Sequence, residues 1–407
     1  MKKINYDLII WGATGFTGQL VAEYLLQQYG VGQTLNWAIA GRSRQKLEEL
    51  CDKLEEEDLP ILTADSHDAA SLKALVKQTK VICSTVGPYA RHGSELVAAC
   101  VENGVDYCDL TGEVQWIRRM IDQHHEKAKN NGVKIVHCCG FDSIPSDMGV
   151  FFLQQSAKEK YGQYCQHIKL RVKAAKGGPS GGTIASLNNV LEEAQQDPSV
   201  FQILENPYSL NPKGEQSGND LPDLDSAAFD KDFNAWIGPF IMAAINTKVV
   251  RRSHALAGYP YGKDFMYDEA TLCGPGLSGR IKAQVLASAI SVMSGGSPNS
   301  LLKKTADFFL PKPGEGPSKI QRETGFYNLA LFGKMKNGLS IKGKVKGDRD
   351  PGYGSTSKML GESAVCLAKD RDTLPKTSGV LTPSIAMGNL LLERLEQNAG
   401  LTFELID

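Results

Sequence analysis

Apolar and polar positions alternate in blocks along the first 150 residues, and the blocks have the lengths of strands and helices in turn. Short apolar runs such as 6–12, 35–41 and 80–88 are typical of buried strands. Between them, stretches such as 16–30 and 114–132 carry apolar residues at helical spacing. This rhythm predicts a Rossmann-type, doubly wound α/β fold, in which helices cover both faces of a parallel sheet.

The pattern changes after residue 150. It predicts a strand over 167–177, a helix over 182–196, a long polar loop over 206–230, and an antiparallel hairpin over 326–348 that turns near Asn337-Gly338. We therefore expect three parts. They are a dinucleotide-binding domain at 1–150, an α+β domain with an antiparallel sheet at 151–352, and C-terminal helices and a strand at 353–407 that pack back on the two domains.

Composition excludes several classes of protein. A formal net charge of -1 gives no electrostatic basis for binding nucleic acid. The nine cysteines include no C-x-x-C pair, which favours buried thiols in a reducing, cytoplasmic setting over disulfides or a metal site. No apolar run has the length of about 18 residues that a membrane-spanning helix needs. We expect 283–296 and 301–317 to form a buried helix pair, while peripheral membrane contact and homodimer formation stay open.

The stretch GATGFTG follows the first predicted strand and opens the first predicted helix. Gly12 allows the tight turn, Gly15 lets a pyrophosphate approach the backbone, and Gly18 permits close packing of helix on strand. Amide groups at the start of the helix then face the phosphates, and Thr14 and Thr17 can add hydroxyl donors. The context of strand, turn and helix predicts a dinucleotide site.

The end of the second predicted strand shows which dinucleotide to expect. An acid at this place would bind the ribose 2′-hydroxyl of NAD, but the sequence has Arg42, followed by Ser43 and Lys46. A guanidinium can pair with a 2′-phosphate, so this stretch predicts a preference for NADP(H) over NAD(H). An ordinary charged surface helix is the alternative interpretation.

Later strand ends supply further candidates, because the ligand of a doubly wound sheet lies at the carboxyl ends of its strands. Asp65 follows the third strand, Ser84 to Pro88 the fourth, and Gly140 to Asp142 the sixth. The predicted cofactor-binding residues are Gly12, Thr14, Gly15, Phe16, Thr17, Gly18, Arg42, Ser43, Lys46, Asp65, Ser84, Val86, Gly87, Pro88, Gly140 and Asp142.

Several separated motifs together carry a family resemblance. These are GATGFTG, AGRS, STVGPYARHGSELVAACVENGVDYCDLTGE, CGFDSIPSDMG, SGGT and DPGYGSTSKMLGESA. With them the chain resembles the saccharopine dehydrogenase-like oxidoreductases, and most closely their trans-acting enoyl reductase branch. The resemblance implies a Rossmann domain, an inserted α+β domain and an NADP-type cofactor. It also implies reduction of a carbon–carbon double bond in an apolar or acyl-type small molecule, as in lipid or polyketide intermediates.

Two other functions remain open at this point. Reduction of an imine or amino acid would need cations that bind substrate carboxylates, for which Arg251 and Arg252 are the obvious pair in the second domain. A sensor that binds NADP(H) without turnover is the other alternative, because no recognisable acid/base pair is present. For a reductase, the candidate proton donors are Tyr89, Tyr353 and Lys358.

Overall fold

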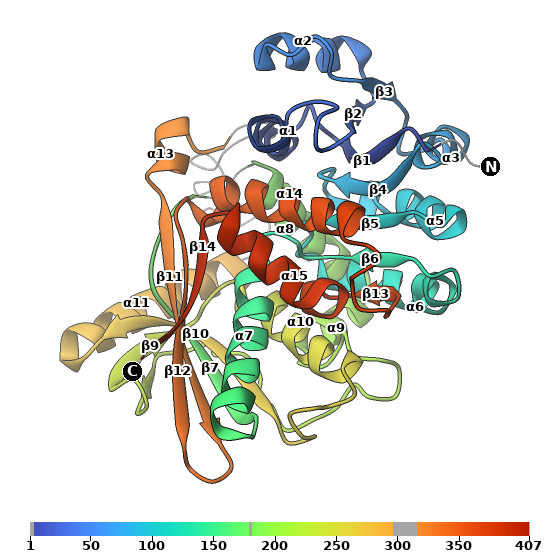
Figure 1. Ribbon diagram of the computed structural model, residues 1–407. Helices are drawn as coiled ribbons and strands as arrows, with labels where there is room; N and C mark the ends of the chain where they lie inside the picture. The colour runs from blue at the N-terminus through green and yellow to red at the C-terminus, as the bar shows by residue number, and fades with distance from the viewer. Residues whose placement is uncertain (1–3, 179–180, 296–315, 407) are drawn as a thin grey trace.

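The computed structural model describes residues 4–178, 181–295 and 316–406. A seven-stranded parallel sheet occupies the upper right of Figure 1, with the strand order β13-β6-β5-β4-β1-β2-β3. Six of these strands lie in the first 150 residues, as predicted: β1 (Tyr6–Trp11), β2 (Trp37–Gly41), β3 (Ile61–Thr63), β4 (Thr79–Ser84), β5 (Asp106–Asp109) and β6 (Lys134–Val136).

Helices cover both faces of this sheet, which confirms the doubly wound fold. Buried side chains form one cluster on each face because apolar residues point from the strands to both sides. One face is covered by α1 (Phe16–Tyr29), α2 (Arg44–Leu54) and α14 (Thr356–Lys369). The other face is covered by α3 (Ala69–Val76), α5 (Ser94–Asn103) and α6 (Val114–Asn130), and the short α4 (Tyr89–His92) follows β4.

A second seven-stranded sheet extends toward the lower left of Figure 1, with the order β14-β12-β11-β7-β10-β9-β8. The expected antiparallel pairing holds along most of it, but β7 and β10 run parallel, so the sheet is mixed. The hairpin is confirmed, since its two strands flank Asn337-Gly338. The strands are β7 (Cys165–Lys176), β8 (Ala228–Asp230), β9 (Ala235–Gly238), β10 (Met266–Gly274), β11 (Phe326–Met335), β12 (Ser340–Gly347) and β14 (Leu401–Ile406).

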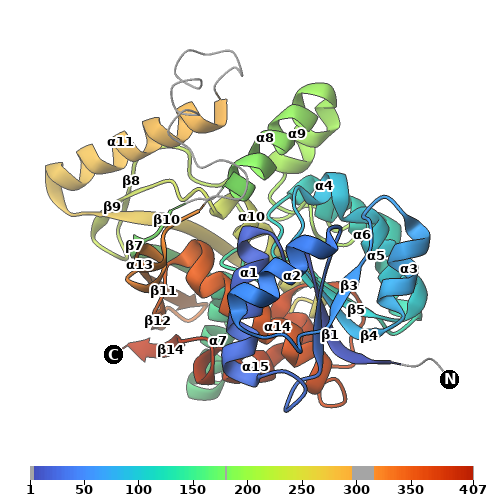
Figure 2. The ribbon, with the colours of Figure 1, turned by 90° about the horizontal axis from the view of Figure 1, so that it is seen from above.

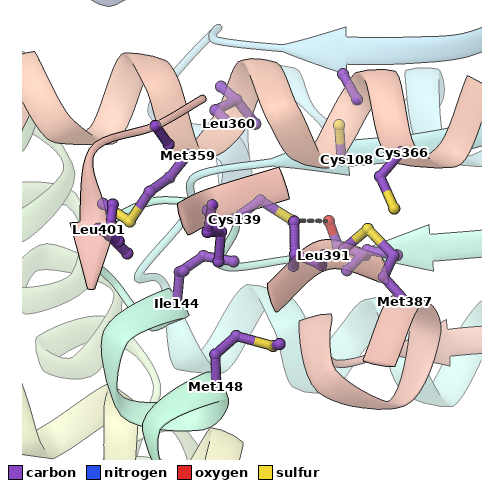
Figure 3. Packing of buried hydrophobic residues seen from close by; sticks show 14 of the residues in the cluster. Cys108, Cys139, Ile144, Met148, Met359, Leu360, Cys366, Met387, Leu391 and Leu401 are labelled. Carbon is purple, nitrogen blue, oxygen red and sulfur yellow. Dashed lines mark hydrogen bonds between the residues drawn. The ribbon is translucent and has the colours of Figure 1, made fainter. Parts of the chain in front are cut away.

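The C-terminal part of the chain contributes to both sheets. The strand β13 (Gly379–Leu381), which the pattern did not predict, pairs with β6, and β14 pairs with β12. Between them, α15 (Pro383–Gln397) packs on α14 and on α7 (Ile144–Tyr161). Figure 3 shows the buried side chains where these helices meet, from Cys108 and Cys139 of the first sheet region to Leu401 of β14. One hydrophobic core thus runs between the two sheets.

The remaining helices lie around the second sheet and its junction with the first. In Figure 2, α8 and α11 are seen at the edge of the molecule, on the same side as α9. Among the described residues no helix combines the length and apolar character needed to cross a membrane. Most of the predicted helix at 301–317 lies outside the described residues. The remaining elements are α8 (Gly181–Gln196), α9 (Pro198–Glu205), α10 (Ala243–Leu256), α11 (Gly276–Gly295), α13 (Lys319–Glu323) and the π-helical turn η1 (Pro351–Ser355).

Candidate functional site

The glycine turn between β1 and α1 has no room for side chains at two of its glycines. A Cβ atom on Gly18 would lie 2.2 Å from the carbonyl oxygen of Gly12, and one on Gly12 would lie 2.4 Å from Cγ2 of Val86. Gly12 also has φ +85°, a backbone conformation that favours glycine. The turn therefore depends on glycine for its shape, as the G-x-x-G-x-x-G spacing predicted.

The first turn of α1 is open to an anion. Gly15 is its N-cap residue and no side chain caps this end, so the amides of Phe16, Thr17 and Gly18 lack an intrahelical acceptor. Such amides and the positive end of the helix dipole bind phosphate groups. A hollow of about 300 Å³ beside this turn is lined by Thr14 and by five residues of α1 and α2: Gln19, Lys46, Glu49, Leu50 and Lys53.

Arg42 lies at the carboxyl end of β2, where the adenosine ribose of a dinucleotide is expected. Its side chain is exposed, and it forms no ion pair within the described residues, whereas Arg44 pairs with Glu48 at 2.8 Å. Ser43 caps α2 by accepting a hydrogen bond from the Lys46 amide at 3.4 Å. Arg42 is thus available to a ligand.

Asp65 belongs to the same neighbourhood. Burial and the nearby charges of His67 and Arg42 lower the pKa of His92, while Asp65 opposes this shift. His67 and His92 lie 3.3 Å apart through their ring nitrogens. The ends of β2, β3 and β4 therefore bring Arg42, Asp65 and two histidines together.

The loop after β4 carries Val86, Gly87 and Pro88 past the glycine turn and ends at Tyr89. The Tyr89 hydroxyl is buried and donates a hydrogen bond to the Ser84 carbonyl at 3.1 Å. Burial raises the pKa of this hydroxyl well above its usual value. As a result, Tyr89 lies beneath the loop rather than at its surface.

Glu113 fixes the same loop, although the sequence did not single it out. Its carboxylate accepts hydrogen bonds from the backbone amides of Tyr89 at 2.8 Å and Ala90 at 3.0 Å. It also accepts one from the Ser186 hydroxyl of α8 at 3.0 Å. Glu113 therefore links the first sheet to α8.

The loop after β6 approaches the second sheet. Gly140 packs against Thr356 of α14, whose hydroxyl accepts a hydrogen bond from the Phe141 amide at 3.0 Å. Asp142, the next residue, is partly buried, and burial together with the charge of Glu269 raises its pKa to about 7. Glu269 comes from β10. The loop after β6 of the first sheet therefore brings Asp142 near an acid of the second sheet.

Glu269 is a buried residue that sequence reasoning missed. It accepts hydrogen bonds from the Tyr267 hydroxyl at 2.6 Å and from the Asn246 amide at 3.0 Å. Burial raises its pKa. The alternation along β10 is a signal that could have found it, since Tyr267 and Glu269 share the inward face of the strand.

Tyr353 and Lys358 lie near the start of α14 but in different surroundings. The buried ring of Tyr353 packs edge-on against Phe16 of the glycine turn, with ring centroids 5.1 Å apart. The Lys358 ammonium pairs instead with the exposed Asp348 at 3.1 Å. Tyr353 therefore contacts the glycine turn, whereas Lys358 pairs with an acid at the surface.

Arg251 and Arg252 both point into the protein. Arg251 pairs with the buried Asp220, and Arg252 donates to the backbone carbonyls of Leu210 and Val380. Both guanidinium groups are buried; Arg251 and Arg252 hold the long loop before β8, and Arg252 also binds β13, although its Nε atom has no hydrogen-bond partner among the described residues. The described residues also contain no group of three or more His, Cys, Asp or Glu side chains that could hold a metal ion.

Comparison with known proteins gives consistent similarities. Residues 8–136 match the family model for the saccharopine dehydrogenase NADP binding domain. The chain is 40% identical, over 96% of its length and 95% of the relative's, to a Mycobacterium tuberculosis protein named as a candidate trans-acting enoyl reductase. It is 36% identical to the trans-acting enoyl reductase of Mycobacterium ulcerans, over 97% and 96% of the two chains.

A solved structure shares the fold. Apo saccharopine dehydrogenase (L-Glu forming) from Saccharomyces cerevisiae superposes with a TM-score of 0.54 over 99% of this chain and 100% of that chain. The two sequences are only 11% identical, so the similarity concerns the fold alone.

Proposed function

This chain belongs to the trans-acting enoyl reductase family, and on that premise we propose that it uses NADPH to reduce a carbon–carbon double bond of an acyl-type small molecule. The family match confirms the resemblance drawn from the motifs, and the matched NADP binding domain confirms NADP(H) as the cofactor. The observation that carries the proposal is the glycine turn with Arg42 at the neighbouring strand end.

The residues of the turn fit a dinucleotide. Where Gly12 and Gly18 exclude side chains, a pyrophosphate can reach the uncapped amides of α1. Arg42, with Ser43 and Lys46 beside it, would hold the 2′-phosphate and so distinguish NADPH from NADH. Bound NADPH supplies a hydride. Gly140 and Asp142 then lie toward the reacting end, because β6 stands on the opposite side of β1 from β2 and β3.

A saccharopine-type imine substrate receives less support. Such a substrate carries carboxylates, and the two arginines expected to bind them are occupied within the protein. Arg251 could serve a substrate only by leaving a buried partner charge unpaired, which costs several kcal/mol. The contacts of this pair therefore favour an acyl substrate without free carboxylates.

A two-stage experiment tests the proposal. The first stage compares the dissociation constants of NADPH and NADH, and we expect much tighter binding of NADPH. The second stage follows consumption of NADPH on α,β-unsaturated acyl thioesters and, in parallel, on imines formed from 2-oxo acids. Turnover restricted to the thioesters supports the proposal. Turnover of imines alone contradicts it, and tight NADPH binding without any turnover indicates a sensor.

A further inference from the structure

We propose that Asp142 is the proton donor of this reductase and that the buried Glu269 of β10 is a positioning residue for it. The inference rests on the proposed function, because only a reduction calls for a proton at this place. It concerns two side chains that lie far apart in the sequence and that the fold brings to the junction of the two sheets.

The position of Asp142 is set by three neighbouring segments. It follows β6 and precedes α7, and a Cβ atom on Gly112, in the loop after β5, would lie 3.3 Å from its Oδ2 atom. The adjacent Phe141 amide is bound by Thr356 of α14. Asp142 therefore stands at the carboxyl ends of β5 and β6, where the reacting end of a dinucleotide lies in this type of fold.

The charges around Asp142 favour its neutral form. Burial is the first cause of its raised pKa, and the carboxylate of Glu269 is the second. The buried Cys138 thiol also lies near Asp142, whose charge contributes to the raised pKa of this thiol. No lysine, arginine or histidine of the described residues lowers the pKa of Asp142. With a pKa of about 7, about half of the Asp142 carboxyls hold a proton at pH 7, and a general acid is most effective when its pKa lies near the operating pH.

Other acids with a raised pKa are already engaged in hydrogen bonds. Asp147, whose pKa burial raises to about 6, accepts from the Ser253 hydroxyl at 2.5 Å and the Ser384 amide at 2.8 Å. Glu113 accepts from two backbone amides and a serine. The Asp142 carboxyl accepts no hydrogen bond within the described residues, and part of the residue stays exposed. It is thus the acid that can turn toward a ligand.

Glu269 is held where it can act on Asp142 but not on a substrate. The Tyr267 hydroxyl and the Asn246 amide each donate to one of its oxygens. Ser146 of α7 adds a third hydrogen bond to the same carboxylate. These donors hold the Glu269 carboxylate in place, and its charge is the second cause of the raised pKa of Asp142.

The chemical step balances with a single proton. When a hydride has bonded to the β carbon of the enoyl group, the electron pair of the double bond moves toward the α carbon and the carbonyl oxygen. The O–H bond of Asp142 then breaks, its proton bonds to the α carbon, and a carboxylate remains. Water returns a proton to that carboxylate before the next turnover.

The first test needs no turnover. Infrared or carbon-13 NMR titration of the cofactor-free protein should show a protonated carboxyl that ionises near pH 7 and is lost in Asp142→Asn. In Glu269→Gln this carboxyl should ionise at lower pH, because one negative charge is gone. Asp147→Asn serves as the matched control: it should remove the Asp147 carboxyl, which has a pKa of about 6, and leave the Asp142 carboxyl unchanged. A wild-type Asp142 that is already ionised at pH about 5 would overturn the inference.

The second test uses an enoyl thioester with a methyl group on the α carbon. At saturating NADPH, Asp142→Asn should lower kcat by about 10²- to 10⁴-fold, the usual contribution of a general acid. The wild type should form one configuration at the α carbon. The variant should form a mixture, because water then supplies the proton from either side. Glu269→Gln should shift the pH profile of kcat/KM to lower pH.

The outcomes separate the inference from the proposed function. Wild-type kcat and a single configuration in a folded Asp142→Asn variant would overturn the inference alone. Turnover of imines instead of enoyl thioesters would overturn the proposed function, and the same variants would still test the donor, since an imine also needs a proton. If the wild type binds NADPH and reduces neither substrate, both proposals fail.

Discussion

Replacing Arg42 by alanine should weaken the binding of NADPH much more than the binding of NADH. The side chain is exposed at the end of β2 and pairs with no acid of the described residues, so its removal leaves no buried charge unpaired. A hydrogen bond to a charged group contributes about 1.5–3 kcal/mol. That energy corresponds to a loss of roughly 10- to 150-fold in NADPH affinity, while NADH, which lacks the 2′-phosphate, should change less than about twofold.

Fluorescence titration of both cofactors against wild type, Arg42→Ala and Arg44→Ala measures this difference. Arg44 is the matched control, because it is two residues away, also exposed, and already paired with Glu48. The NADPH loss in Arg42→Ala should also shrink as salt is raised, since an exposed charge pair is screened. Equal losses for NADPH and NADH in Arg42→Ala, or the larger loss in Arg44→Ala, would refute this role.

Three further perturbations test other parts of the structure. Gly18→Ala should abolish NADPH binding in a titration and lower the melting temperature, because its Cβ would lie 2.2 Å from the Gly12 carbonyl oxygen. Arg251→Leu should lower the free energy of unfolding by about 3–5 kcal/mol by leaving the buried Asp220 carboxylate without its cationic partner. A selective rise in KM for an imine, with stability unchanged, would contradict that reasoning. Because the pKa of Asp142 is raised from 3.8 to about 7, the wild type loses stability as the pH rises between these values. In denaturant unfolding, the free energy of unfolding of Asp142→Asn should therefore rise relative to that of the wild type over this range, by up to about 4 kcal/mol at 1.36 kcal/mol per pH unit. A difference that stays constant across pH would contradict the assignment.

Much of the fold could be predicted because local patterns determine it. The alternation of short apolar runs with helical stretches gave the strands of the first sheet, and Asn337-Gly338 located the hairpin. The pairing of β7 with β10 could not be predicted, because alternation identifies a strand but not its neighbour or direction. The three residues of β13 form too short an apolar run to be distinguished from a loop.

The candidate site likewise contains residues that the sequence alone could locate and others that only the tertiary structure reveals. The glycine turn and Arg42 are contiguous features with a known spacing, so the sequence alone located them. Arg251 and Arg252 are evident in the sequence as a cationic pair, but their partners, Asp220 and the carbonyls of Leu210 and Val380, are known only from the tertiary structure. The closeness of Glu269 to the loop after β6 depends entirely on tertiary structure.

Asp142 and Glu269 are brought near each other by packing between α7 and the second sheet, which involves other residues than the two acids. The helix α7 begins just after Asp142 and lies against the second sheet, which also contains β10 with Glu269. Gly149 of α7 allows this approach, since a Cβ atom there would lie 3.0 Å from Cγ2 of Val345 in β12. This contact belongs to the core that both sheets share, so it holds α7 and the loop before it against the second sheet. The carboxyl pair should therefore be formed before any cofactor or substrate binds, which is why its protonation can be measured in the free protein.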